Sequence, residues 1–147
     1  MIFTDLMKES GYEISLVSIS SEPRTNDAEL RIIVNRSKEV SDLLIYPHPD
    51  SQVKTIQIDF PNYITYAVVY DDYTVWNDNH LYTGDSFRIY EKSSYLDYVQ
   101  KEFRVQDKNL KHYSLACFEH QVDIISEYEP IITVGSPLKY QNTNTVR

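Results

Sequence analysis

Residues 64–71 read ITYAVVYD and place apolar side chains on both faces of an extended segment. Side chains on a strand alternate between its two faces, so a segment that is apolar on both faces is typical of a covered strand. The segment therefore predicts the central strand of a sheet. Tyr66 and Tyr70 share their face with Val68, and this alternation favours a core position for both tyrosines.

Other segments on both sides of this one alternate between apolar and polar residues, as strands with one buried face do. In two of them the inward face is plain: Leu30, Ile32 and Val34 in one, and Ile56, Ile58 and Phe60 in the other. Residues 43–46 form a short apolar run that ends at a proline-rich loop. The predicted strands are 14–20, 30–35, 54–60, 64–71, 87–91, 112–118, 122–126 and 131–134.

Helical spacing predicts one substantial helix, Tyr95–Val105. Leu96, Val99 and Phe103 recur at the spacing that forms one apolar stripe. Ser94, followed three residues later by Asp97, resembles a capping box at the start of this helix. A short helix is also predicted near the N-terminus, over residues 4–10, because Gly11 follows it as a C-terminal stop.

Together these elements predict an α+β fold: a mostly antiparallel sheet of about seven strands with the late helix Tyr95–Val105 packed on it and a short N-terminal helix. Strands and helices do not alternate, which excludes repeated βαβ units. The chain has 147 residues, the size of one domain. We expect residues 1–134 to form that domain and residues 135–147 to form a flexible C-terminal tail.

Charge and cysteine content limit the functional classes. The chain has 14 basic and 22 acidic residues, a net charge of −8. This balance disfavours nucleic acid as a partner, which needs cations against phosphate, and it suits a basic protein partner. Cys117 is the only cysteine, so no internal disulfide is expected. The sequence contains no signal-peptide pattern and no apolar run long enough for a membrane span, and a cytoplasmic location is expected.

Tyrosine is unusually frequent: the chain has 13, of which six lie between Tyr63 and Tyr90. Tyrosine offers a large contact area with little conformational entropy to lose, so this density favours a recognition surface. Aromatic residues also favour strands, so sheet packing is an open alternative. The candidate partner-binding residues are the aromatic Tyr73, Trp76 and Tyr82 and the acidic Asp71, Asp72, Asp78 and Asp85.

Cys117 is a candidate nucleophile that has possible bases near it in sequence. His112, His120 and Asp123 are within six residues of it. However, Cys117 shares strand parity with Leu115, whereas His112 and His120 have the opposite parity. Cys117 is therefore predicted to be a core residue, and no catalytic residue is predicted.

His80, with Asp71, Asp72 and Asp78, is the one group that suggests a metal site. The spacing matches neither an EF-hand nor a helical zinc motif, and Asn77-Asp78-Asn79 is ordinary turn chemistry. No phosphate-binding or dinucleotide-binding glycine motif is present. No metal and no cofactor are therefore predicted.

Four stretches together resemble a family of short, single-domain bacterial proteins associated with toxin-immunity genes. They are LRIIVNRSKEVSDLLIYP (30–47), IDFPNYITYAVVYDDYTVWND (58–78), FRIYEKSSYLDYVQ (87–100) and KHYSLACFEHQVDIISEYEP (111–130). The resemblance covers residues 28–130 and rests on packing motifs. It implies a cytosolic protective binder and assigns no functional residue.

These observations leave three hypotheses of function. The first is a non-enzymatic protein-binding module, an immunity protein that neutralises a basic toxin domain by direct binding. The alternative is a small-ligand domain that holds a sugar or nucleoside in an aromatic-lined cleft. The least supported is a small hydrolase-type enzyme that uses Cys117 or a His/Asp pair.

Overall fold

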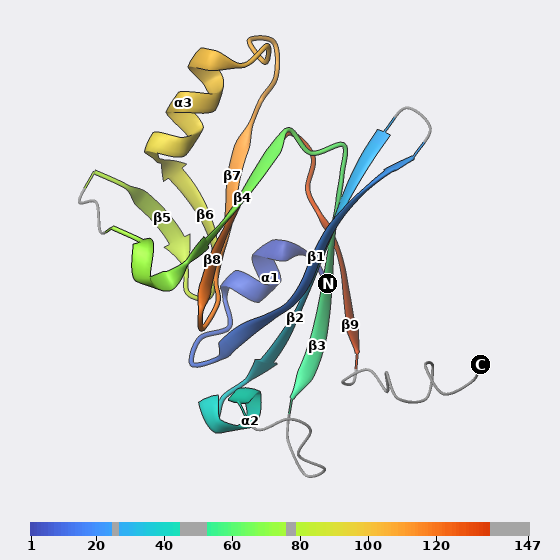
Figure 1. Cartoon of the computed structure of the whole chain (residues 1–147), viewed down its shortest axis with the longest axis vertical. Helices are drawn as coiled ribbons and strands as arrows, with labels where there is room; N and C mark the ends of the chain where they lie inside the picture. Colours follow the sequence, from blue (N-terminus) through green and yellow to red (C-terminus); the bar gives the residue numbers. More distant parts are fainter. Residues whose placement is uncertain (25–26, 45–52, 76–78, 136–147) are drawn as a thin grey trace.

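Two antiparallel sheets carry the fold in the computed structural model, which describes residues 1–24, 27–44, 53–75 and 79–135 (Figure 1). One sheet has four strands, in the order β1 (Glu13–Arg24), β2 (Asp27–Ser37), β3 (Lys54–Pro61) and β9 (Ile131–Gly135). The other has five, in the order β4 (Thr65–Tyr70), β8 (His120–Ser126), β7 (Lys111–Ala116), β6 (Phe87–Lys92) and β5 (Leu81–Gly84).

The main core lies between the two sheets. The predicted inward faces are confirmed, because Leu30, Ile32 and Val34 on β2 and Ile56, Ile58 and Phe60 on β3 are all fully buried. They share one hydrophobic cluster with the inward face of the five-stranded sheet, which is formed by Phe87, Tyr113, Leu115, Val122 and Ile124. The α+β class is thus correct, but the sheet of about seven strands is in fact a pair of sheets with nine strands among the described residues.

A β-bulge adjusts the long hairpin of β1 and β2. Leu16 pairs with Val34 and Ser18 with Ile33, which leaves Val17 as the extra residue. An extra residue reverses the alternation of faces, so Leu16 and Ile19 both pack against the core although they are three residues apart. Val17 itself is 39% exposed.

Helices close the sandwich at one end and cover part of its outside. The predicted N-terminal helix is present as α1 (Phe3–Met7), shorter than the predicted 4–10, and it lies between the two sheets (Figure 1). Its Phe3 and Leu6 are buried in the main core. A second short helix, α2 (Val40–Leu44), follows β2. It replaces the apolar run predicted at 43–46, of which residues 45 and 46 lie outside the described part of the chain.

The late helix, α3 (Ser94–Glu102), packs on the outer face of the five-stranded sheet. Val99 is fully buried, and Leu96 and Phe103 are half-buried against the same cluster, which also contains Ile125 of β8. Leu96 and Val99 confirm the predicted stripe, but the helix ends at Glu102 and not at Val105, so Phe103 reaches the cluster from the extended residue that follows the helix. The cap is one residue earlier than predicted, because the Ser93 hydroxyl, not that of Ser94, accepts a hydrogen bond from the Leu96 amide at 3.1 Å.

The segment predicted as the central strand is an edge strand. Among the described residues β4 pairs only with β8. Its two apolar faces meet different surroundings: Tyr66 packs against the main core, whereas Val69 borders a cleft on the outside. Val68 and Tyr70 are 38% and 46% exposed, so the core position predicted for Tyr70 is wrong.

The predicted domain boundaries have the following outcome. The single domain over 1–134 stays a prediction, and the predicted tail lies outside the described residues except for residue 135, which ends β9. No helix in the described part of the chain has the length and apolarity that a membrane crossing requires.

Candidate functional site

The predicted partner-binding residues fall in three places. Asp71, Asp72 and Tyr73 form the 3₁₀ turn η1 (Asp71–Tyr73) directly after edge strand β4, and all three are exposed. Tyr82 lies on β5, at the opposite edge of the same sheet. Asp85 lies in the turn after β5, where its carboxylate accepts a hydrogen bond from the Gly11 amide at 3.4 Å. Trp76 and Asp78 lie outside the described residues.

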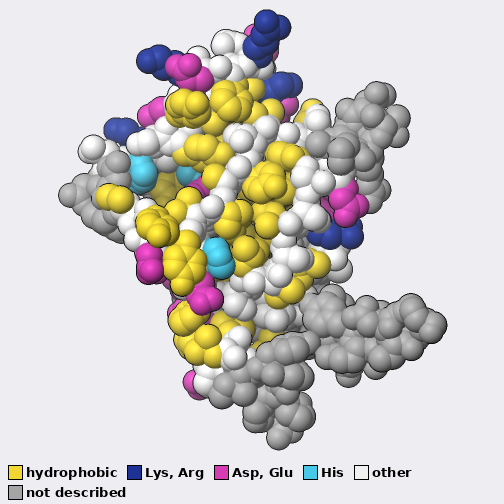
Figure 2. Space-filling model, in the orientation of Figure 1, with side chains coloured by type: hydrophobic (Ala, Val, Ile, Leu, Met, Phe, Trp, Pro, Cys, Tyr) yellow, Lys and Arg dark blue, Asp and Glu magenta, His cyan; other side chains and the backbone are white. Residues whose placement is uncertain are grey.

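An exposed aromatic and acidic surface surrounds η1. We call it the edge patch, and its members are Tyr70, Asp71, Asp72, Tyr73 and Val75. The rings of Tyr70 and Tyr73 lie 6.4 Å apart, and Tyr70 also contacts the ring of His120 at 5.6 Å. Tyr73 and Val75 are 78% and 86% exposed. Figure 2 shows hydrophobic side chains gathered over this side of the molecule, with acidic side chains along its left flank.

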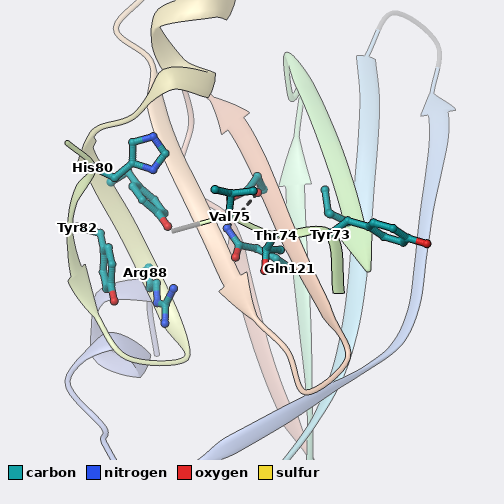
Figure 3. A pocket seen from close by; sticks show the side chains of 10 residues that line it. Tyr73, Thr74, Val75, His80, Tyr82, Arg88 and Gln121 are labelled. Carbon is teal, nitrogen blue, oxygen red and sulfur yellow. Dashed lines mark hydrogen bonds between the residues drawn. The ribbon is translucent and has the colours of Figure 1, made fainter. Parts of the chain in front are cut away.

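A cleft of about 360 Å³ lies on the outer face of the five-stranded sheet. Figure 3 shows His80, Tyr82 and Arg88 along one side of it and Thr74, Val75 and Gln121 across from them. The ring of Tyr73 points away from the His80–Tyr82–Arg88 side (Figure 3). The edge patch and the cleft therefore share a border at Tyr73 and Val75 but face different directions.

The β5–β6 hairpin forms the aromatic side of the cleft. Its turn needs a glycine, because Gly84 has a φ of +104° and a Cβ atom there would lie 2.0 Å from the carbonyl oxygen of Phe87. Tyr82 and Tyr90 pair across this hairpin with ring centroids 5.2 Å apart. The Arg88 guanidinium lies 4.4 Å from the centre of the Tyr82 ring and donates from Nε to the Asp85 carbonyl at 2.6 Å.

A chain of polar side chains leads from the start of α3 to the floor of the cleft. Ser93 Oγ lies 2.6 Å from His112 Nδ1, and His112 Nε2 lies 2.8 Å from Asp123 Oδ1. A carboxylate can only accept, so Nε2 donates to Asp123, and the hydroxyl of Ser93 can donate to Nδ1. The ring of His112 also stacks on Tyr90, with centroids 4.4 Å apart. The buried side chains of His112 and Ser93 thereby fix the orientation of the Asp123 carboxylate.

This serine, histidine and aspartate set is a structural network, because its serine lacks the access that a nucleophile needs. Ser93 is 1% exposed and His112 is 3% exposed, so no substrate reaches the hydroxyl. The same hydroxyl caps α3 through the Leu96 amide. A nucleophile must instead be accessible beside its base.

Cys117 is a core residue, as its parity predicts. It belongs to the main hydrophobic cluster and is 7% exposed. Burial raises the pKa of its thiol to about 12, which disfavours the reactive thiolate. The geometry argues against the thiol-based version of the enzyme hypothesis.

His80 is engaged with the start of α3. Its Nε2 accepts a hydrogen bond from the Ser94 amide at 3.2 Å. In the described part of the chain, no three histidine, cysteine, aspartate or glutamate side chains are grouped as metal ligands would be. Of the acidic residues that the sequence places with His80, Asp78 lies outside the described part.

Sequence reasoning missed the contribution of Arg88, Tyr90, Gln121 and Asp123 to one cleft. The sequence offers Asp123 as a possible base near Cys117, but the two side chains lie on opposite faces of the sheet. One signal was available: the predicted hairpin of 112–118 and 122–126 brings His112 and Asp123 to diagonal positions on one face, since His112 pairs with Ile125 and Ser114 with Asp123. The β5 strand, which carries Tyr82, was not predicted.

Comparisons of the chain with protein-family models, with curated proteins and with solved structures found no match. The resemblance to immunity-associated proteins therefore stays a prediction.

Proposed function

We propose that this chain is a non-enzymatic protein-binding module that contacts its partner through the edge patch. The observation that carries the proposal is the exposure of Tyr73 and Val75, at 78% and 86%, beside two exposed aspartates. Buried aromatic anchors supply most of the binding energy of protein interfaces, and exposed rings on a short turn are available to become such anchors.

The electrostatics favour a basic partner. Asp71 and Asp72 lie next to Tyr73 in sequence, and the whole chain has a net charge of −8. Complementary charge raises the association rate and suppresses wrong partners. A basic toxin domain, neutralised in the cytoplasm by an immunity protein, is the partner class that fits this charge and the resemblance.

The position of the patch adds a second means of contact. Among the described residues β4 has a neighbour on one side only, so the backbone groups of its other edge are available to a strand of the partner. Strand addition there would bring the partner directly beside Tyr70 and η1.

The test is capture of a partner from cells that express the chain, followed by binding kinetics of defined variants. Tyr73→Ala is expected to weaken binding by at least about thirtyfold, the effect of losing an anchor worth about 2 kcal/mol. Asp71→Asn with Asp72→Asn is expected to slow association, more at low salt than at high salt.

Tyr128→Ala is the matched control, because Tyr128 is also an exposed tyrosine, at 50%, but lies after β8 and outside the edge patch. It should bind like the parent. Equal binding by the parent, Tyr73→Ala and the double asparagine variant, with folding confirmed by circular dichroism, would place the interface elsewhere and contradict the proposal.

A further inference from the structure

The cleft on the outer face of the five-stranded sheet has features of a ligand site, and protein binding through the edge patch does not explain them. Its volume of about 360 Å³ is at the small end of the range for small-molecule sites, roughly 300–1,000 Å³. One side is aromatic, β8 provides the polar side chains of Gln121 and Asp123, and Thr74 and Val75 lie across from the aromatic side. We propose that this cleft binds a sugar ring, either a monosaccharide or the terminal unit of a longer glycan.

Asp123 supports sugar binding, because its carboxylate is a hydrogen-bond acceptor whose orientation is fixed before any ligand binds. Its side chain is 14% exposed, and it borders the cleft. Oδ1 is fixed by His112, which Ser93 fixes in turn at 2.6 Å. Among the residues that the structure describes, Oδ2 accepts only a long hydrogen bond from Gln121, at 3.4 Å. A carboxylate oriented in this way can accept from one or two ligand hydroxyls with little further loss of its own side-chain entropy.

Charge is the second argument. Arg88 and Asp123 are the two formally charged residues among the described residues that border the cleft, and their charges are opposite. An anionic ligand would meet Asp123, and a cationic ligand would meet Arg88. A neutral ring with several hydroxyls avoids both conflicts, because each hydroxyl can accept from the guanidinium or donate to the carboxylate. The amide of Gln121 adds a donor and an acceptor between them.

Ring geometry is the third argument, and it separates a sugar from a nucleoside. A flat base prefers a slot between parallel rings, but Tyr82 and Tyr90 are inclined at 50°, and His80 and Tyr90 at 88°. The one parallel stack nearby among the described residues, Tyr90 on His112 at 14°, is internal to the protein. A sugar presents both C–H groups and hydroxyls, and it needs no pair of parallel rings. Tyr82 is half-exposed and has the Arg88 guanidinium over its ring at 4.4 Å, so the two side chains together offer an aromatic ring and hydrogen-bond donors.

The test is a titration followed by amide chemical shifts in ¹⁵N–¹H NMR spectra of the whole chain. The probes are D-glucose, D-galactose, D-mannose and N-acetyl-D-glucosamine, with adenosine and uridine as the competing ligand class. We expect saturable shift changes from at least one sugar, concentrated at residues 80–82, 88–90 and 121–123.

Two variants address the cleft alone. Gln121→Ala removes a polar group of the cleft, and Tyr82→Ala removes its half-exposed tyrosine ring. Each is expected to weaken sugar binding at least about tenfold. Tyr128→Ala, which changes a half-exposed tyrosine elsewhere, should bind the sugar like the parent. The spectra of the variants report whether each one is folded.

Three results would overturn the proposal: no saturable change with any of the sugars, changes that map outside the cleft, or unaltered affinity in folded Gln121→Ala and Tyr82→Ala. Binding of a nucleoside without a sugar would refute the ligand class. The outcome is independent of the edge patch, because Gln121 lies outside it. A failed titration leaves the protein-binding proposal intact, and a failed partner capture leaves the sugar proposal intact.

Discussion

The buried side chain of Ser93 contacts both the start of α3 and the polar network of the cleft. Its hydroxyl accepts from the Leu96 amide at the start of α3 and lies 2.6 Å from His112, which holds Asp123 at the cleft. The Ser93 hydroxyl and both ring nitrogens of His112 thus have partners, as a low-dielectric environment requires. One residue therefore links the position of a helix to the orientation of a carboxylate on the neighbouring sheet.

Tyr113 is the contrasting case. Its ring makes edge contacts with Phe3 at 5.1 Å and Phe60 at 5.2 Å, but its hydroxyl has no hydrogen-bond partner among the described residues. Tyr113→Phe keeps the ring contacts and removes the unpaired hydroxyl. We expect the free energy of unfolding at neutral pH to rise by about 1 kcal/mol, as measured by urea denaturation.

The same substitution has a pH signature. Burial raises the pKa of Tyr113 to about 12 in the folded state, above about 10 in the unfolded chain. The unfolded chain therefore loses the proton first, so stability falls as the pH rises between those two values. Tyr113→Phe should lose less stability than the parent in that window. An equal alkaline loss, or a variant less stable than the parent at neutral pH, would contradict this interpretation.

At the scale of elements, α3 depends on packing more than on its own length. It has nine residues, which is short for an isolated helix, and its anchors are the buried Val99 and the half-buried Leu96 and Phe103. Ser93 and Ser94 at its start also engage His112 and His80. Loss of the helix would therefore disturb the cleft as well as the outer core.

A pair of truncations measures this dependence. Val99→Ala is expected to lower the free energy of unfolding by about 2 kcal/mol, because two fully buried methyl groups are lost. Phe103→Ala should cost less than the ~3–5 kcal/mol of a fully buried phenylalanine, since its ring is half-buried. Thermal or urea denaturation provides the comparison.

Gln100→Ala is the control within the same helix, because Gln100 is exposed and should change stability by less than about 0.5 kcal/mol. If Val99→Ala and Gln100→Ala had equal effects, the apolar stripe would not be the surface that attaches α3 to the sheet.

At the scale of the whole molecule, the two sheets share one core, and this has a consequence for unfolding. Ile58 of the four-stranded sheet and Leu115 of the five-stranded sheet are both fully buried in the cluster between them. Neither sheet can bury its inner face without the other. The described residues should therefore unfold as one cooperative unit.

Ile58→Ala and Leu115→Ala test this on opposite sides of the core. Each is expected to lower the free energy of unfolding by ~2–5 kcal/mol. Native-state hydrogen exchange should show that each substitution reduces the protection of the most stable amides in both sheets by similar amounts. Reduced protection confined to the substituted sheet would instead indicate two separately stable units.

Local patterns in the sequence determined the burial of β2 and β3, the late helix and its stripe, the core position of Cys117 and the α+β class. These follow from side-chain alternation and helical spacing, which each segment expresses without its neighbours. Only the tertiary structure decided that the strands form two sheets, that β4 is an edge, and that Tyr82, Arg88, Gln121 and Asp123 border one cleft. The alternation of apolar and polar residues in a strand is the same whether its inner face belongs to one sheet or to one of two packed sheets. Strand pairing also brings together residues that lie far apart in the sequence, and the spacing of residues within one segment contains no information about such pairing.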